Sequence, residues 1–279
     1  LINSIIPSFD EKTNRYLHDF RSKYSSDYIL SLIENLRNLK VMVIGEAIID
    51  EYVYCESMGK SGKESMLVMK YLSKEQYAGG SLAIANHLAD FCDNVSMACY
   101  LGTEKTEEDF VRNSLKANVD PLFVYKSESP TIVKRRFVDS YSLSKLLGVY
   151  NLNGEQLNPD EENMLCNILE ERIAEYDVII VADYDHGLFT PKVIDLLTNK
   201  SRFLALNTQI NAANMGFHAI SKYQYADYVC IHEGEIRLDR RNRKGDLKDL
   251  ISDLASRMGN SSIMITRGSK GSLLYRKDE

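Results

Sequence analysis

From residue 40 onward, short apolar runs alternate with longer stretches whose apolar residues recur at helical spacing. The apolar runs lie at 40–45, 94–100, 120–125, 177–182, 202–206, 227–231 and 262–266. The helical stretches lie at 81–92, 106–117, 160–174, 191–199 and 246–258. Strands that alternate with helices in this way form a mostly parallel sheet with helices on both faces. The pattern therefore predicts one large α/β domain over residues 40–279.

Two regions depart from this alternation. Residues 51–77 and 131–151 have apolar residues at every second position and contain no helical stretch. This period is typical of strands with one buried face, so we expect antiparallel strands that lie off the main sheet and form a lid. Ahead of the first strand, residues 10–39 have helical spacing, with Ser25 and Ser26 as candidate caps. Residues 1–39 are therefore predicted to be a helical leader.

The composition restricts the class of protein. The chain has 279 residues and a net charge of −6. No apolar run reaches the roughly 18 to 20 residues that a membrane helix needs, and the composition is that of a soluble globular protein. The acidic balance argues against nucleic-acid binding as the main activity. The cysteines lack a CxxC pair and indicate buried thiols of a reducing cytoplasm rather than a zinc site: Cys55, Cys92, Cys99, Cys166 and Cys230.

The first predicted strand ends in an acidic stretch, at the edge where open parallel sheets bind ligands. Directly after its apolar run Val41-Met42-Val43-Ile44 comes Gly45-Glu46-Ala47-Ile48-Ile49-Asp50-Glu51-Tyr52. Asp50 lies in extended backbone, where its carboxylate is available to substrate hydroxyl groups. Further along, Gly79 and Gly80 precede a predicted helix and would let a ligand approach its first N–H groups. A tight turn without a ligand is the simpler explanation of the two glycines on their own.

Basic side chains gather in the run Pro130-Thr131-Ile132-Val133-Lys134-Arg135-Arg136-Phe137-Val138. Strand alternation puts Lys134 and Arg136 on one face and Arg135 on the other. The first two suit a substrate phosphate, because ammonium and guanidinium groups form charge-assisted hydrogen bonds with phosphate oxygens. A charged edge strand that resists aggregation is an equally favoured alternative.

Two later strand ends carry further polar candidates at the same edge of the predicted sheet. Asp183 follows the strand 177–182 and is a candidate for binding substrate hydroxyls, with Asp185 as the alternative. His186, in the same turn, is more often a loop residue than a catalyst. Asn207 closes the next strand at the equivalent position, which places it on the predicted cofactor side.

The last two strand ends indicate nucleotide and metal chemistry. Glu235 follows the strand 227–231 and could orient hydrated Mg²⁺ beside nucleotide phosphates. An acid that complements the dipole of a helix N-terminus is the alternative. Thr266, Gly268 and Gly271 lie in a strand, glycine turn and strand that can expose N–H groups and a hydroxyl to phosphates. The same residues can equally form a plain hairpin.

Taken in order, these segments resemble the ribokinase/PfkB family of carbohydrate kinases: GEAIIDEY, AGGSLAIAN, SPTIVKRRFV, VADYDHGLF, YVCIHEGEI and ITRGSKGSLLY. The GEAIIDEY and PTIVKRR segments are most similar to the heptose-7-phosphate kinase branch, the kinase module of bifunctional ADP-heptose biosynthesis proteins. The resemblance implies a Rossmann-like ribokinase fold with a small β lid that often mediates homodimerisation. It also implies ATP and Mg²⁺ as cofactors.

The same resemblance implies roles for individual residues. Asp50, Gly79 and Gly80 would contact the sugar, and Lys134 and Arg136 would lie near the substrate phosphate. On the nucleotide side, Glu235 would belong to the magnesium-phosphate motif of the family. Thr266, Gly268 and Gly271 would face the nucleotide itself.

A late Gly-Ala-Gly-Asp motif, which carries the catalytic base of the family, is expected beyond residue 279. The chain begins with Leu1 and stops at Glu279 just after a strand-like segment, so we expect a longer protein that lacks its C-terminal part here, with fusion to further domains left open. The predicted function is ATP-dependent phosphorylation of a sugar or sugar-phosphate hydroxyl in the cytoplasm. The alternative is a non-catalytic sugar- or nucleotide-binding module of degenerate kinase fold. A nicotinamide-dependent dehydrogenase is disfavoured because no G-x-G-x-x-G follows the first strand.

Overall fold

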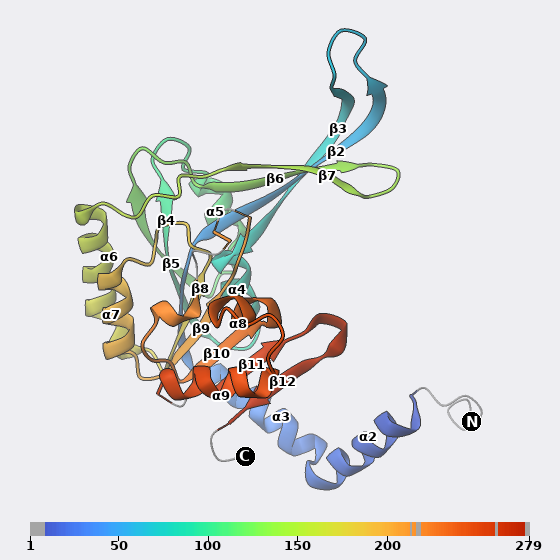
Figure 1. Ribbon diagram of the computed structural model, residues 1–279. Helices are drawn as coiled ribbons and strands as arrows, with labels where there is room; N and C mark the ends of the chain where they lie inside the picture. The colour runs from blue at the N-terminus through green and yellow to red at the C-terminus, as the bar shows by residue number, and fades with distance from the viewer. Residues whose placement is uncertain (1–8, 213, 216–218, 260–261, 277–279) are drawn as a thin grey trace.

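The computed structural model of the chain describes residues 9–212, 214–215, 219–259 and 262–276. Within these residues, eight strands form a main sheet in the order β12-β11-β10-β9-β8-β1-β4-β5 (Figure 1). All neighbours pair in parallel except β11 and β12, which are antiparallel. The strands are β1 (Lys40–Gly45), β4 (Asn94–Gly102), β5 (Val119–Lys126), β8 (Val178–Asp183), β9 (Leu204–Thr208), β10 (Tyr228–His232), β11 (Ser262–Thr266) and β12 (Ser272–Tyr275). The predicted α/β fold with a mostly parallel sheet is confirmed.

Helices cover both faces of the main sheet. Met42 and Ile44 of β1 belong to one buried cluster, whereas Val41 and Val43 belong to another, so β1 is buried on both sides. The first cluster takes its helical side chains from α6, α7, α8 and α9, and the second from α4 and α5. The helices are α4 (Ser81–Leu88), α5 (Glu108–Ser114), α6 (Pro159–Arg172), α7 (Pro191–Lys200), α8 (Glu233–Asp239) and α9 (Leu247–Arg257), with single 3₁₀ turns η2 (Ile173–Glu175), η3 (Ile220–Lys222) and η4 (Gly268–Lys270).

Local sequence explains where α6 begins. The Asn158 side chain accepts the N–H of Glu161, and the Glu161 side chain accepts the N–H of Asn158. This capping box satisfies two N–H groups at the start of α6. α5, by contrast, ends earlier than predicted, at a residue that a side chain of α4 contacts. The prediction extended it to residue 117, but the Ser114 carbonyl accepts the Asn86 side-chain amide at 2.8 Å and the backbone of Leu115 is extended.

The two regions with period-two alternation form a second sheet, in the order β3-β2-β6-β7. Its strands are β2 (Ala47–Lys60), β3 (Leu67–Gly80), β6 (Ile132–Asp139) and β7 (Lys145–Asn151). The outer pairs are antiparallel as expected, but β2 and β6 pair in parallel, so the prediction of an entirely antiparallel group was wrong. Both strands follow main-sheet strands, β1 and β5, that run in the same direction. They therefore leave the same edge of the main sheet side by side (Figure 1).

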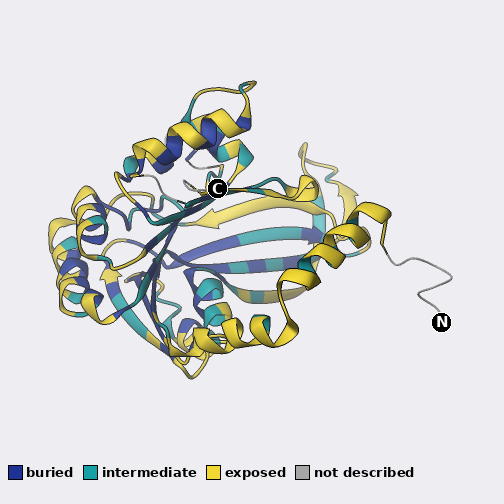
Figure 2. Ribbon diagram, turned by 90° about the horizontal axis from the view of Figure 1, so that it is seen from below, coloured by how far each residue is buried: buried dark blue, intermediate teal, exposed yellow. Residues whose placement is uncertain are grey.

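The predicted helical leader contains α2 (Glu11–Lys23), α3 (Ser26–Asn35) and the 3₁₀ turn η1 (Leu36–Asn38). Ser25 caps α3 by accepting the N–H of Tyr28, while Ser26 is the first residue of the helix rather than its cap. None of the described residues of these helices is buried, and Figure 2 shows them as an exposed arm beside the body of the protein. No helix in the described ranges combines the length and the apolar character of a membrane span.

Candidate functional site

The site lies where the second sheet leaves the main sheet. Asp50 on β2 and Lys134 on β6 are direct partners in the parallel pairing, and Tyr52 is the partner of Arg136. Side chains of residues two apart share a face of a strand, so Asp50, Lys134 and Arg136 lie together. Arg136 donates a hydrogen bond to the Asp50 carboxylate and forms an ion pair with it. The structure thus brings together the predicted sugar-binding acid and the two predicted phosphate-binding cations.

Lys134 and Arg136 differ in their surroundings. The Lys134 side chain takes part in none of the hydrogen bonds or ion pairs identified among the described residues, and the residue is only 7% exposed. Burial lowers the pKa of its ammonium group, although Asp50 and Glu46 act in the opposite direction. Its Nζ lies 5.6 Å from the ring centroids of both Tyr150 and Tyr184. The ammonium therefore lies near aromatic rings, and no carboxylate of the described residues is bound directly to it.

Gly79 and Gly80 make close packing around Asp50 possible. A Cβ atom on Gly79 would collide with the Asp50 carboxylate. Gly80 has a φ of +57°, and a Cβ there would lie 2.5 Å from the carbonyl oxygen of Glu46. Only glycine tolerates such contacts and a positive φ easily. Both glycines thus lie at the predicted site, between Asp50 and the start of α4.

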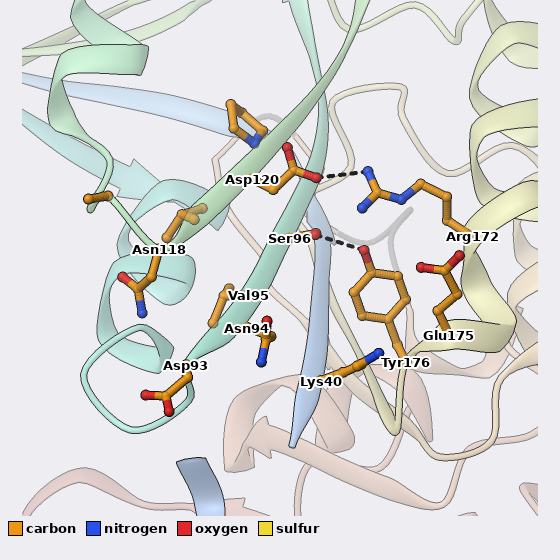
Figure 3. A pocket seen from close by; sticks show the side chains of 13 residues that line it. Lys40, Asp93, Asn94, Val95, Ser96, Asn118, Asp120, Arg172, Glu175 and Tyr176 are labelled. Carbon is orange, nitrogen blue, oxygen red and sulfur yellow. Dashed lines mark hydrogen bonds and ion pairs between the residues drawn. The ribbon is translucent and has the colours of Figure 1, made fainter. Parts of the chain in front are cut away.

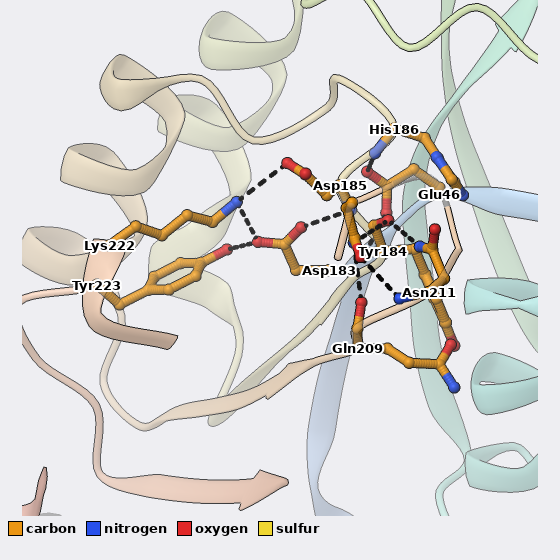
Figure 4. Close-up of polar contacts among 10 residues, drawn as sticks. Glu46, Asp183, Tyr184, Asp185, His186, Gln209, Asn211, Lys222 and Tyr223 are labelled. Atoms are coloured by element: carbon orange, nitrogen blue, oxygen red, sulfur yellow. Dashed lines mark hydrogen bonds and ion pairs between the residues drawn. The ribbon is translucent and has the colours of Figure 1, made fainter. Parts of the chain in front are cut away.

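Glu46 is a site residue that the sequence analysis did not single out. Its side chain is fully buried and accepts the N–H groups of Tyr184 and His186 at 3.0 and 3.1 Å (Figure 4). Burial raises its pKa to about 7, and the charge of Asp183 adds to the effect. Glu46 thus ties the end of β1 to the loop after β8. An acid immediately after the glycine that ends a buried strand was the available signal.

Asp183 is not exposed to the site. Its carboxylate is fully buried and accepts the Tyr223 hydroxyl at 2.7 Å and the Asp185 N–H at 3.0 Å. The Lys222 ammonium lies 2.6 Å from the same carboxylate (Figure 4). These contacts hold the loop after β8 against η3. The structure therefore does not bring Asp183 to the surface at which a sugar could bind, contrary to the expectation from its strand-end position.

Tyr184 is fixed from a second loop that the sequence analysis also missed. Asn211 and Asn214 donate side-chain hydrogen bonds to the Tyr184 carbonyl oxygen at 2.9 and 3.3 Å. Figure 4 shows Asn211 and Gln209 next to the Tyr184 backbone. The available signal was the series of amide side chains directly after β9, whereas the strand-end pattern pointed only to Asn207. Loops after β1, β8 and β9 thus converge on Tyr184.

Asn207 and Glu235 make structural contacts at the neighbouring strand ends. Asn207 donates to the carbonyl oxygen of Cys230 at 2.7 Å. Glu235 accepts the N–H of Ile210 at 3.0 Å and that of His232 at 2.6 Å, the second contact being part of the cap of α8. Each Glu235 oxygen already binds a main-chain donor, and the described residues include no cluster of three potential metal ligands. The residues present therefore do not fit direct coordination of Mg²⁺ by Glu235.

The glycine turn after β11 is open. Gly268 and Gly271 have φ values of +57° and +81°, and a Cβ on either would meet nothing within 4 Å. Thr266 ends β11, with its hydroxyl 3.5 Å from the carbonyl oxygen of Ile231. Such a turn fits the approach of a phosphate group. β10, β9 and β8 lie between β11 and β1 in the sheet. Four strand-to-strand spacings therefore separate β11 from β1, which amounts to roughly 19 Å. The turn and Asp50 thus occupy different parts of one sheet edge.

A cavity of about 500 Å³ lies at the opposite edge of the main sheet, beside the amino-terminal ends of β1, β4 and β5 (Figure 3). Tyr176 donates to Ser96 at 2.7 Å in its wall, and Arg172 pairs with Asp120 at 2.8 Å. These two contacts each join two polar groups that line the cavity. Because it is remote from Asp50 and Lys134, we assign it no part in the activity.

The main sheet with its covering helices and the smaller second sheet define an α/β protein whose candidate site lies at the carboxyl edge of the parallel sheet. Residues 38–279 match the family model described as pfkB family carbohydrate kinase. The chain belongs to the pfkB family of carbohydrate kinases. The resemblance inferred from the sequence segments is thereby confirmed.

Similar proteins include two curated relatives called Bifunctional protein HldE. The one from Trichlorobacter lovleyi is 22% identical over 248 residues, which cover 88% of this chain and 50% of the relative. The one from Campylobacter jejuni subsp. doylei is 24% identical over 253 residues, with 85% and 50% covered. The chain thus spans about half the length of the curated relatives it matches.

Solved structures with the same fold include two sugar kinases. Phosphofructokinase-2 from Escherichia coli, in complex with fructose-6-phosphate, superposes with a TM-score of 0.65 at 14% identity, covering 86% of this chain and 78% of that one. Ribokinase from Thermotoga maritima gives a TM-score of 0.61 at 16% identity, with 86% and 76% covered. At these identities the likeness establishes the fold.

Proposed function

We propose that this chain is the kinase module of an enzyme that transfers the γ-phosphoryl group of ATP to a hydroxyl of a sugar phosphate, with a heptose phosphate as the favoured substrate. Family membership and the HldE relatives support a sugar kinase. The observation that carries the choice of a phosphorylated substrate is the Lys134 ammonium, which is largely buried beside Asp50 and, within the described part of the chain, has no carboxylate bound to it. A neutral sugar needs no such cation.

Each residue of the site then has a distinct role. The Asp50 carboxylate accepts hydrogen bonds from sugar hydroxyls, and Gly79 leaves room for that carboxylate. Arg136 orients Asp50 through their ion pair and is therefore less available to a phosphate than the sequence suggested. Lys134 binds the substrate phosphate through charge-assisted hydrogen bonds. This division of roles replaces the symmetrical pair of phosphate-binding cations.

The nucleotide would bind along the same sheet edge. Backbone N–H groups of the open turn around Gly268 and Gly271 would bind its phosphates, and ATP supplies the phosphoryl group. Mg²⁺ would accompany the nucleotide phosphates, with no ligand assigned to it among the described residues. Catalysis of phosphoryl transfer consists mostly of positioning and charge stabilisation, and the second sheet would exclude water as a lid. We assign no catalytic base within the described ranges.

The test is the preference for a phosphorylated sugar in the complete natural polypeptide that contains this chain. We expect heptose 7-phosphate to bind about 10- to 150-fold more tightly than unphosphorylated heptose, because a hydrogen bond to a charged group contributes about 1.5 to 3 kcal/mol. Lys134→Gln should abolish this preference while leaving ATP affinity unchanged. Isothermal titration calorimetry measures the three affinities, and a coupled assay measures phosphoryl transfer.

Arg135→Gln is the matched control, since Arg135 lies on the opposite face of the same strand and pairs with Glu51. It should keep the preference for the phosphorylated sugar. Equal binding of both sugars by the wild type would overturn the choice of substrate. Binding of sugar phosphate and ATP without any phosphoryl transfer would favour a non-catalytic binding module instead.

We also propose that the second sheet pairs with that of a second copy. Its face opposite Asp50 and Lys134 has a hollow of about 380 Å³, lined almost entirely by apolar side chains that water would otherwise contact.

Leu147→Asp, which places a charge at this hollow, should convert a dimer into a monomer, as measured by light scattering during size-exclusion chromatography. Met164→Asp on α6, also at an exposed apolar position, should not. A monomeric wild type at high concentration would refute the dimer. The residues lining the hollow are Val53, Cys55, Leu67, Met69, Tyr71, Phe137, Leu146 and Leu147.

A further inference from the structure

The Lys134 ammonium lies near two tyrosine rings, one from a strand of the second sheet and one from a loop of the main sheet. Tyr150 is its direct neighbour on β7 of the second sheet. Tyr184 belongs to the loop that follows β8 of the main sheet. The distance from Nζ to each ring centroid is 5.6 Å, which is within the range of cation–π attraction. The ammonium group thus interacts with one ring from the second sheet and one ring from a loop of the main sheet.

The position of Tyr184 is determined by the body of the protein. Its N–H donates to the buried Glu46 carboxylate, and its carbonyl oxygen accepts hydrogen bonds from Asn211 and Asn214. Burial raises the pKa of its phenol to about 12, so the ring is neutral near pH 7. Tyr184 therefore presents an uncharged ring to Lys134 from a loop that is hydrogen-bonded on both sides of the residue.

We infer that Tyr150 and Tyr184 are positioning residues that hold the Lys134 ammonium between the two sheets and thereby set the preference of the site for an anionic group of the substrate. A buried ammonium needs a partner, and a carboxylate bound to it would neutralise the charge that attracts the anion. Aromatic rings stabilise the cation and leave its charge available. The inference rests on the proposed function of this site.

The first test uses the protein without any ligand. Tyr150→Leu and Tyr184→Leu remove a ring, whereas Tyr150→Phe and Tyr184→Phe keep it. The acid dissociation constant of Lys134 can be obtained from the pH dependence of its acylation, quantified on the peptide that contains it. Each leucine variant should increase this constant roughly tenfold, while each phenylalanine variant should match the wild type. The other charged groups that act on Lys134 stay in place: Glu46, Asp50 and Arg136.

The second test uses inorganic phosphate as the probe. Its dissociation constant should rise roughly tenfold in the leucine variants and stay at the wild-type value in the phenylalanine variants, whereas affinity for an unphosphorylated sugar should not change. Tyr150 is 42% exposed, so its substitution leaves the buried core intact even where Tyr184→Leu disturbs folding. Leucine variants with the wild-type Lys134 titration and phosphate affinity would overturn the inference. Because the titration needs no catalysis, that result is distinguishable from a failure of the proposed kinase activity.

Discussion

Asp50→Ala is expected to lower the affinity for the sugar substrate and the rate of phosphoryl transfer by about 10²- to 10⁴-fold. The carboxylate would accept two hydrogen bonds from sugar hydroxyls, each contributing about 1.5 to 3 kcal/mol because the acceptor is charged. Asp50 is only partly buried, with its side chain 27% exposed, so the fold should persist. Calorimetric sugar binding, steady-state kinetics and urea denaturation measure the three quantities.

Gly79→Ala provides an independent test of the same geometry. The added methyl group would collide with the Asp50 carboxylate and displace it, so sugar affinity should fall although every polar group remains. Gly62→Ala in the turn between β2 and β3 is the control, because a Cβ there meets nothing within 4 Å. Unchanged sugar binding in Asp50→Ala would remove Asp50 from the site, whatever Gly79→Ala does.

Glu46 is expected to make the protein less stable as the pH rises from about 4.5 to 7. Its pKa is about 7 in the folded protein and lies near 4.5 in the unfolded chain, so the folded state binds the proton more tightly across this range. The contribution of Glu46 to the free energy of unfolding is fully present below pH 4.5 and is lost as the pH rises through 7. The loss in the free energy of unfolding should be about 3 kcal/mol for a shift of this size.

Glu46→Gln should remove this part of the pH dependence, because glutamine does not titrate. Urea denaturation followed by circular dichroism at pH 5, 6, 7 and 8 would compare the variant with the wild type. Glu34→Gln, on the exposed helix α3, controls for the general effect of removing a carboxylate and should retain the wild-type slope. A Glu46→Gln profile parallel to that of the wild type would show that Glu46 titrates at its ordinary value.

The main features of the fold followed from patterns within short segments. The buried run at β1 and the helical spacing of α6 and α7 predicted the parallel sheet and its covering helices, because the period of apolar residues reports which faces are buried. The start of α6 was equally local, since Asn158 and Glu161 bind each other's backbone across one turn. The strand alternation also placed Lys134 and Arg136 on one face. These properties depend on residues that are close in sequence.

The tertiary structure decided which of these groups meet. The pattern at Asp183 was that of a ligand-binding strand end, but Tyr223 and Lys222, distant in sequence, enclose its carboxylate. The pattern at Arg136 was that of a phosphate ligand, but the parallel pairing of β2 with β6 places it against Asp50.

The role of Glu46 and the position of Lys134 near Tyr150 and Tyr184 arise in the same way, since each depends on strands and loops that are distant in sequence and meet at one point. Local periodicity fixes the face on which a side chain lies. The partner it meets there is chosen by the packing of distant segments, which no local pattern records.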